Sequence, residues 1–439
     1  MTRAIINRKP ASLARKLTMV LVHKGNLVVI HLERDIKMQT MKKQKNLEHD
    51  GNHNQPRLHV GSQPVTDAVE LTNGRDQRQS KEKRRSKRSQ DYTGVHLGEE
   101  CITVLTDEER STIEALVSSL PSFDSQHLDD DSIFTQISIA KKDIPSRLAA
   151  KLIEFRKHSN DYGTLLFRNL PRDPVLPPTP KDEGRAESKT HVSESVLLSM
   201  MMYLGEPIAY EDEKEGTIVQ NVCPVQGKEE RQENTGSAFF DFHIENSFHP
   251  HKPDYLGLLC LRSDHDQIAK TATASIRKAL DKVPGKLISL LRQPLYHIRV
   301  ASSFMKDGEP ALYSPLLPIL SGDVIQPDLC INFYNTEAIN SAAQLAFDAL
   351  KAALLEVVAD VVLLPGDLLI IDNRVAVHGR TAFQPRYDGN DRWLQRLFVV
   401  EDFRRSQESR HRGSHICIPL TAELLPLQDG FSEDNSESA

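Results

Sequence analysis

The sequence contains no run of eighteen apolar residues, which excludes a membrane-spanning helix of ordinary length. Its longest apolar stretches, such as residues 361–364 and 368–371, have the length of strands. Cysteine is also scarce: the five present are scattered and never in C-x-x-C spacing, which argues against both a disulfide framework and a zinc site. We therefore expect a protein without membrane contact that works in the reducing cytoplasm.

Basic residues are in the minority outside the N-terminus. Residues 1–90 hold 20 Lys and Arg against 8 Asp and Glu, which leaves 35 against 53, a net charge of −18, in the remainder. Contacts to phosphate need a clustered basic surface. We therefore do not expect nucleic acid as a substrate or partner.

Three regions differ in composition. Residues 1–95 are basic, show little periodicity and are predicted to be a disordered extension. The first 32 residues lack acidic side chains, so a mitochondrial-type transit peptide stays open, but a plain extension or a misplaced start codon is favoured. Residues 96–420 suffice for one large catalytic domain, and the acidic tail 421–439 is predicted to be disordered.

Periodicity within residues 96–420 indicates a mixed α+β domain. Helices are expected at residues 107–120, after the capping box of Thr106 and Glu109, and at 146–157, 193–203 and 342–358, the last of them buried. Strands are expected at residues 163–168, 255–261, 271–275, 295–300, 361–364, 368–373 and 392–400. Many short strands flanked by helices favour a double-stranded β-helix, or jelly roll. The polar residues 211–236 are expected to form a loop that closes over a site.

An H-x-E triplet, His243 and Glu245, follows a strand-like run. Alternation predicts that Phe240, Phe242 and Ile244 pack on one face and that the imidazole and carboxylate point to the other. Two histidines and a carboxylate form the facial triad of non-haem iron(II) oxygenases, which leaves adjacent metal positions open. A further histidine is needed.

His378 lies 133 residues beyond Glu245, just past an apolar strand, and Arg392 and Arg396 follow it at +14 and +18. Strand parity places both arginines on one face with Leu394. A lone histidine at such a place is usually structural, and the arginines could equally lie on an exposed edge strand. Buried arginines, in contrast, would need carboxylate partners, which their planar fork suits.

Together these residues resemble the iron(II)/2-oxoglutarate-dependent oxygenases of the clavaminate synthase-like branch. The resemblance covers about residues 100–405 and rests on His243-x-Glu245, on residues 253–262, on Thr271, 26 residues past Glu245, and on the segment from Gly366 to His378-Gly379-Arg380 with its two later arginines. Within the branch it is strongest for hydroxylases of free L-arginine, L-asparagine and L-lysine.

The resemblance implies roles for individual residues. His243, Glu245 and His378 would bind iron(II), while Arg392 and Thr271 would hold the distal carboxylate of 2-oxoglutarate. The substrate would be contacted by a further set: Arg396 at its α-carboxylate, Glu245 at its α-amine, and Gln220 and Asn234.

The implied reaction is hydroxylation of an unactivated C–H of a free L-amino acid, with dioxygen consumed and 2-oxoglutarate decarboxylated to succinate. Relatives that act on arginine carry acidic residues after the mid-domain strands, whereas this chain has Ile331-Asn332-Phe333-Tyr334-Asn335, which disfavours a cationic side chain. Two alternatives stay open: desaturation or cyclisation of another small polar substrate, and a non-catalytic jelly roll that binds a metabolite. The oligomeric state is not indicated.

Overall fold

The computed structural model describes residues 94–121, 123, 128–181, 191–232, 235–305, 308 and 310–421, together with the backbone of two strands near the N-terminus. The chain divides into units at residues 1–72 and 73–439. In the first unit, β1 (Leu17–His23) pairs antiparallel with β2 (Asn26–Leu32), a pairing that the sequence did not lead us to expect. The rest of the predicted extension up to residue 93, and the tail from residue 422, lie outside the described residues.

The second unit is built around a sheet of eight strands, which we call the major sheet. Its order is β19-β6-β18-β9-β16-β5-β4, and β7 pairs with β18 beside β6. The strands are β4 (Ile102–Val104), β5 (Thr164–Arg168), β6 (Glu206–Tyr210), β7 (Val219–Val222), β9 (Tyr255–Arg262), β16 (Leu368–Asp372), β18 (Trp393–Val400) and β19 (Ile416–Cys417).

A sheet of five strands, the minor sheet, has the order β3-β15-β10-β17-β8. Its strands are β3 (Val95–His96), β8 (Phe240–His243), β10 (Lys270–Ser275), β15 (Ala359–Val362) and β17 (Ala376–Arg380). Between β10 and β15 the chain makes an excursion that contains α6 (Ile276–Ala279), α7 (Gly285–Leu291), β11 (Tyr296–Ile298), β12 (Leu320–Gly322), β13 (Pro327–Leu329), β14 (Thr336–Ala338) and α8 (Ser341–Glu356).

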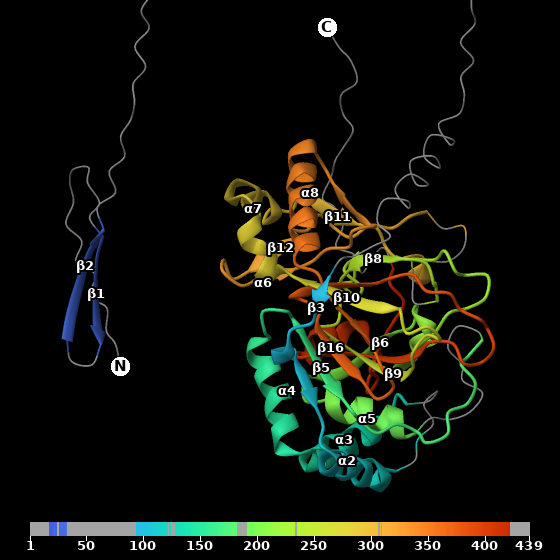
Figure 1. The fold of residues 1–439 in the computed structure, drawn as a ribbon. Coiled ribbons are helices and arrows are strands. Elements are labelled where there is room, and N and C mark those ends of the chain that lie inside the picture. The colour runs from blue at the N-terminus through green and yellow to red at the C-terminus, as the bar shows by residue number, and fades with distance from the viewer. Residues whose placement is uncertain are drawn as a thin grey trace, which may run out of the picture. The chain divides into compact units, whose positions relative to one another are not determined.

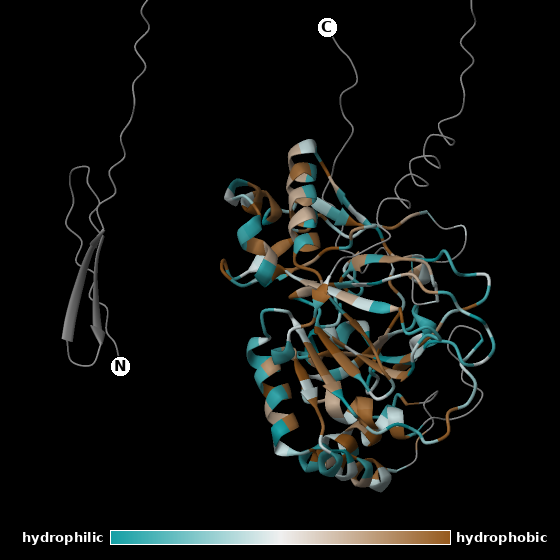
Figure 2. Ribbon diagram, viewed as in Figure 1, coloured by the Kyte–Doolittle hydropathy of each residue, from teal (hydrophilic) through white to brown (hydrophobic). Residues whose placement is uncertain are grey.

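Helices cover the outer faces of the two sheets, so the unit has four layers (Figure 1). One apolar cluster joins the major sheet to α2 (Asp107–Ser119), α3 (Asp131–Ala140), α4 (Ser146–His158) and α5 (Val192–Met201). A second cluster fills the space between the sheets, and a third joins the minor sheet to α6, α7 and α8. The strands at the centre are correspondingly apolar in Figure 2. This is the layered jelly roll with flanking helices that the sequence predicted.

Strand parity explains how polar side chains reach the interior between the sheets. On β18, Leu397 and Val399 belong to the cluster under the helices, while Leu394 and Phe398 belong to the cluster between the sheets. Arg396 shares the parity of Leu394 and Phe398 and is only 1% exposed. The prediction that this arginine lies on an inward strand face is therefore confirmed, and the exposed-edge alternative is wrong.

Local signals account for most elements. Thr106 caps α2: its side chain accepts a hydrogen bond from the Glu109 backbone N–H, and Glu109 reciprocates. Two expectations were wrong. Residues 211–236 are not all loop, because residues 219–222 form β7, which pairs with β18. Helix α8 is not buried on most faces, because Leu345 is 60% exposed. Helix α3 was not predicted from the sequence. Among the described residues, no helix combines the length and apolar character that a membrane crossing requires.

Removal of residues 1–90 should leave a soluble protein that unfolds within a few degrees of the full chain, because the named site residues and all pairings of the two large sheets lie beyond that point. Removal of residues 1–98 is the contrasting control, since it also removes β3, which pairs with β15, and the buried Leu97. Thermal unfolding measures the melting temperature of both proteins, and only the longer deletion should lower it by more than a few degrees. An insoluble product from the shorter deletion would show that the extension packs on the domain.

Candidate active site

The minor sheet brings His243, Glu245 and His378 together. His243 ends β8 and lies directly opposite His378 of β17 in the antiparallel register. Glu245 follows two residues later, just past the strand. All three side chains are buried, and one potential ligand atom from each lies within 4.8 Å of the others. The predicted grouping of these three residues is thus present in the structure.

His243 is held in one tautomer. Its Nδ1 lies 2.9 Å from the carbonyl oxygen of Asp241, which can only accept, so Nδ1 carries the proton and the lone pair of Nε2 is available. Burial, followed by the neighbouring His378, lowers the pKa of His243 to about 3, which keeps the imidazole neutral. A neutral imidazole with a free Nε2 is the form that binds a metal.

The predicted alternation of β8 is wrong at Phe240. Phe242 and Ile244 pack under α8 as expected, but Phe240 is half-buried and its ring stacks on that of His243 at 4.2 Å. The register of β8 on β17 shifts between His378 and Arg380, and this bulge turns the first residue of β8 away from the core. Gly379 lies at the bulge, where a Cβ would come within 2.6 Å of the Phe240 carbonyl oxygen.

Glu245 is fixed at both its backbone and its side chain. Asn373, fully buried, accepts a hydrogen bond from the Glu245 N–H at 2.8 Å and donates to its carbonyl oxygen at 3.1 Å. Burial alone would raise the pKa of Glu245, but Arg396 and then the two histidines outweigh it and hold that pKa well below its ordinary value. Glu245 is therefore an ionised carboxylate.

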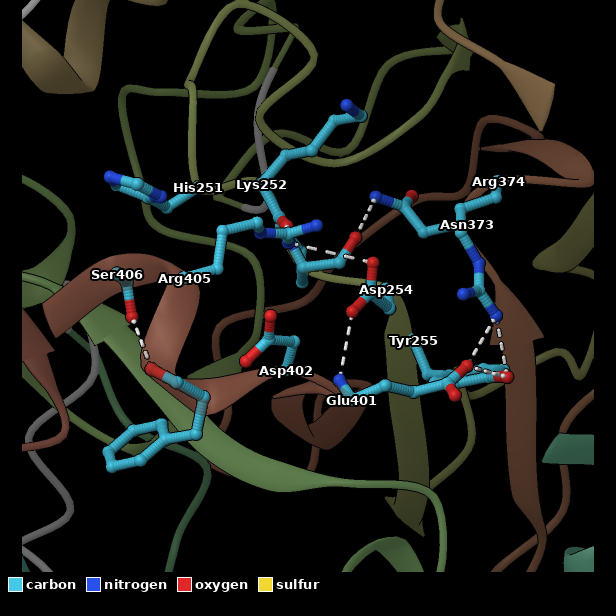
Figure 3. Close-up of polar contacts among 12 residues, drawn as sticks. His251, Lys252, Asp254, Tyr255, Asn373, Arg374, Glu401, Asp402, Arg405 and Ser406 are labelled. Carbon is cyan, nitrogen blue, oxygen red and sulfur yellow. Dashed lines mark hydrogen bonds and ion pairs between the residues drawn. The ribbon is translucent and has the colours of Figure 1, made fainter. Parts of the chain in front are cut away.

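Asn373 belongs to a wider polar network, shown in Figure 3, that anchors the turn between β16 and β17. It donates to the carbonyl oxygen of Pro253, while Arg374 bonds to the Tyr255 hydroxyl and pairs with Glu401 at 2.8 Å. The carboxylate of Asp254 accepts the N–H of Glu401. The turn that precedes His378 is thus tied to the start of β9 and the end of β18.

Arg396 forms the most highly connected ion pair of the site. Its guanidinium donates to Glu245 at 2.9 Å, to the Glu213 carboxylate, and to the side-chain oxygen of Gln220, its partner in the register of β18 on β7. The structure therefore brings together Arg396, Gln220 and Glu245 as predicted. It adds Glu213, which the sequence analysis missed because nothing distinguishes this residue within an acidic loop. Asn234, the other predicted substrate contact, lies outside the described residues.

Arg392 and Thr271 also meet, as predicted: Arg392 Nη2 donates to Thr271 Oγ1 at 3.4 Å. Arg380, which the sequence analysis quoted only as part of a motif, lies nearby on β17. Burial and then Arg392 lower the pKa of Arg380 to about 9. Two like charges are therefore buried side by side.

A cavity of about 280 Å³ opens beside His243 and Glu245. Its wall comes from the 212–235 segment, from the end of β8, and from the excursion between β10 and β15. The last of these supplies Asn332 and Asn335, the positions that the sequence analysis compared with acidic residues of arginine-specific relatives. The cavity can hold a small polar molecule against the His243 and Glu245 side chains.

Comparison with known proteins assigns the family. Residues 134–398 match the model of the family described as taurine catabolism dioxygenase TauD, TfdA. The chain belongs to the TauD/TfdA dioxygenase family. It is therefore an oxygenase of the iron(II)/2-oxoglutarate-dependent class, in the clavaminate synthase-like branch, and the non-catalytic alternative is wrong.

Two members with similar sequences show which enzymes of the TauD/TfdA family this chain resembles. The chain is 41% identical to L-asparagine oxygenase of Streptomyces coelicolor over 273 residues, which are 62% of this chain and 81% of that protein. It is 35% identical to L-lysine 3-hydroxylase of Catenulispora acidiphila over 314 residues, 70% of this chain and 86% of that protein.

Solved structures agree. An asparagine oxygenase in complex with iron(II), 2S,3S-3-hydroxyasparagine and succinate superimposes with a TM-score of 0.68 at 36% identity, over 72% of this chain and 99% of that one. A non-haem iron oxygenase in complex with iron, succinate and (3R,4R)-dihydroxy-L-arginine superimposes with a TM-score of 0.66 at 29% identity, over 72% of this chain and 99% of that one. The donor set of this chain fits iron(II), because it offers a neutral imidazole with a free Nε2, an ionised carboxylate and a second imidazole around one point.

Replacement of Asn373 by Ala should destabilise the protein by about 2 kcal/mol or more, since it strands a buried N–H and two carbonyl oxygens. Because Glu245 then loses its backbone support, iron(II) affinity should fall by about tenfold or more. Thermal unfolding and metal titration measure the two effects. Asn390→Ala, in an exposed turn, is the control. Unchanged iron affinity in Asn373→Ala would show that the hydrogen bonds of Asn373 to the Glu245 backbone do not position the carboxylate.

Proposed function

We propose that this TauD/TfdA oxygenase hydroxylates a C–H bond of a free L-amino acid with a polar, uncharged side chain. In this proposal His243, Glu245 and His378 hold iron(II), and Arg392 with Thr271 holds the distal carboxylate of 2-oxoglutarate. Iron(II), 2-oxoglutarate and dioxygen together supply the oxidation of the C–H bond and yield succinate. The observation that carries the proposal is the buried ion pair of Arg396 with Glu213 and Glu245.

A zwitterion is the ligand that such a pair can accept at little electrostatic cost. The α-carboxylate of an amino acid can replace a carboxylate at Arg396, while its α-ammonium takes over the acceptors on Glu213 or Glu245. Every buried charge then keeps an opposite partner, and none is left unpaired. A simple carboxylic acid would displace a protein carboxylate from Arg396 without supplying a cation for it.

The cavity wall indicates the side chain. Asn332 and Asn335 line the cavity and are neutral, in the segment where the resemblance implies acidic residues for relatives that act on arginine. Asn332 Oδ1 accepts the backbone N–H groups of Tyr334 and Asn335, so this wall is rigid. An amide or hydroxyl side chain fits neutral polar surroundings better than a guanidinium or ammonium. The similarity to asparagine oxygenase supports the same class of substrate, and Asn234 is retained as a proposed contact.

The residues around the metal position divide the remaining work. Phe240 packs on the His243 ring and, with Phe248, gives the cavity an apolar side. Residues 212–214, 231–232 and 235 contribute a polar wall, and Gln232 bonds to the backbone of Phe239 and Asp241 at the entry to β8. This arrangement orients a substrate against the metal ligands and restricts water.

A cytoplasmic location is part of the proposal. Its support is that the five cysteines, all of which lie within the described residues, form no disulfide bond with one another.

A screen of the twenty amino acids for substrate-stimulated succinate release should find stimulation by L-asparagine or a similarly neutral polar amino acid, and little by L-arginine or L-lysine. The product should gain one oxygen atom by mass spectrometry; loss of two hydrogens would indicate desaturation or cyclisation instead. His378→Ala is the inactive control. Equal stimulation by amino acids blocked at the amine and carboxylate would contradict recognition of the zwitterion.

Substitutions of Arg396 on β18 and of Arg392 just before it should affect the KM values of different substrates. Arg396→Leu should raise the KM for the amino acid about tenfold or more, with a smaller effect on 2-oxoglutarate, because a charged hydrogen bond contributes about 1.5–3 kcal/mol. Arg392→Leu should do the reverse. Glu213→Gln, which keeps the shape of the side chain, repeats the first test without leaving a buried carboxylate unpaired. If Arg396→Leu and Glu213→Gln alter only the KM for 2-oxoglutarate, the assignment fails.

A further inference from the structure

Arg380 and Arg392 are unusual in being buried next to each other. They are 6% and 5% exposed, and their guanidinium carbons lie 5.0 and 5.9 Å from the centre of the same ring, that of Phe383. Phe383 is itself buried. Both cations therefore occupy one small region between the sheets, at the end of β17 and the start of β18.

Neither arginine forms an ion pair with a carboxylate among the described residues. Arg392 donates to Thr271 Oγ1, and Arg380 donates through Nη2 to the Ala238 carbonyl oxygen at 2.8 Å. The Nε of Arg380 is buried without a hydrogen-bond partner among the described residues. Cys260 and then Asp264 favour the charged form of Arg392 without an ion pair to it, and the Asp264 oxygens accept the backbone N–H groups of residues 268 and 269.

The contrast with Arg396 is informative. Arg396 is equally buried yet has two carboxylates and an amide oxygen around its guanidinium. A buried guanidinium without an anion is costly, and two neighbouring ones more so. Such a site is arranged for an anion that arrives from outside the chain.

The sheet register points these groups to one place. Thr271 of β10 lies directly opposite Arg380 of β17, so their side chains share the inward face, and the Thr271 hydroxyl also meets Arg392. On β17 Arg380 has the same parity as His378. The anion site therefore lies along the same face as the proposed metal ligand.

We infer that Arg380 is a second anchor for the distal carboxylate of 2-oxoglutarate, which it binds jointly with Arg392 and Thr271. The inference rests on the proposed function and deepens it. Two guanidinium groups can donate to both oxygens of one carboxylate, whereas Arg392 alone can serve it from one side. Arg380 is thus a determinant of selectivity for a dicarboxylic 2-oxo acid over a monocarboxylic one.

Binding of two 2-oxo acids to the iron(II)-loaded protein without oxygen, measured by calorimetry, tests the inference. The probes are 2-oxoglutarate and 2-oxovalerate, which has the same chain length but no distal carboxylate. Arg380→Met should weaken 2-oxoglutarate about tenfold or more and leave 2-oxovalerate within about twofold. Arg386→Met, at a 54% exposed side chain of the following loop, should change neither.

Arg380→Lys keeps the charge but loses the fork, so it should show the same selective loss to a smaller degree. A variant that weakens both acids equally would overturn the inference, since Arg380 would then act through its bond to Ala238. Unchanged affinity for 2-oxoglutarate in both Arg380 variants would also overturn it, with the proposed function intact. Failure of the unmodified protein to bind 2-oxoglutarate would overturn both.

Discussion

Charge buried between two apolar sheets is the constraint on which this active site depends. An ion removed from water needs an opposite charge or several hydrogen bonds close by. The protein meets this need in two ways. Around Arg396 the compensating carboxylates, Glu213 and Glu245, belong to the chain itself. Around Arg380 and Arg392 the described part of the chain supplies a hydroxyl, a carbonyl oxygen and no ion-paired carboxylate, and we propose that a ligand supplies the opposite charge.

The two arrangements suit two kinds of ligand. A co-substrate with a free terminal carboxylate brings net negative charge to a positive site and can bind tightly there. An amino acid brings both signs at once and exchanges partners with an existing ion pair. Both arrangements lie at or near β18, whose inward face carries Arg396 between the apolar Leu394 and Phe398 and is preceded by Arg392.

Much of this could be predicted from local pattern. The spacing of His243 and Glu245 and the parity of Arg396 follow from strand geometry, while the role of the distant His378 was implied by the family resemblance; the structure brings all four together. The prediction for Phe240 was wrong because a bulge arises from the pairing of two strands far apart in sequence. Glu213 and the clamp formed by Asn373 were missed for a similar reason, because the partners of a polar side chain are fixed by tertiary packing. The same holds for β7, a short strand in a polar stretch that exists because β18 offers it an edge.

The residues around the site come from two kinds of segment. The histidines and arginines stand on paired strands, whereas Glu213, Asn332 and Asn335 come from two excursions that leave the sheets and return to them. Within these excursions only β7 on β18 and residues 331–333 beside the end of β8 take part in the pairing around the site, so changes confined to the other loop residues there disturb these strands little. A scaffold of this kind separates the chemistry from the choice of substrate, so new specificities can be obtained by exchange of the two excursions while the oxidising centre is inherited unchanged.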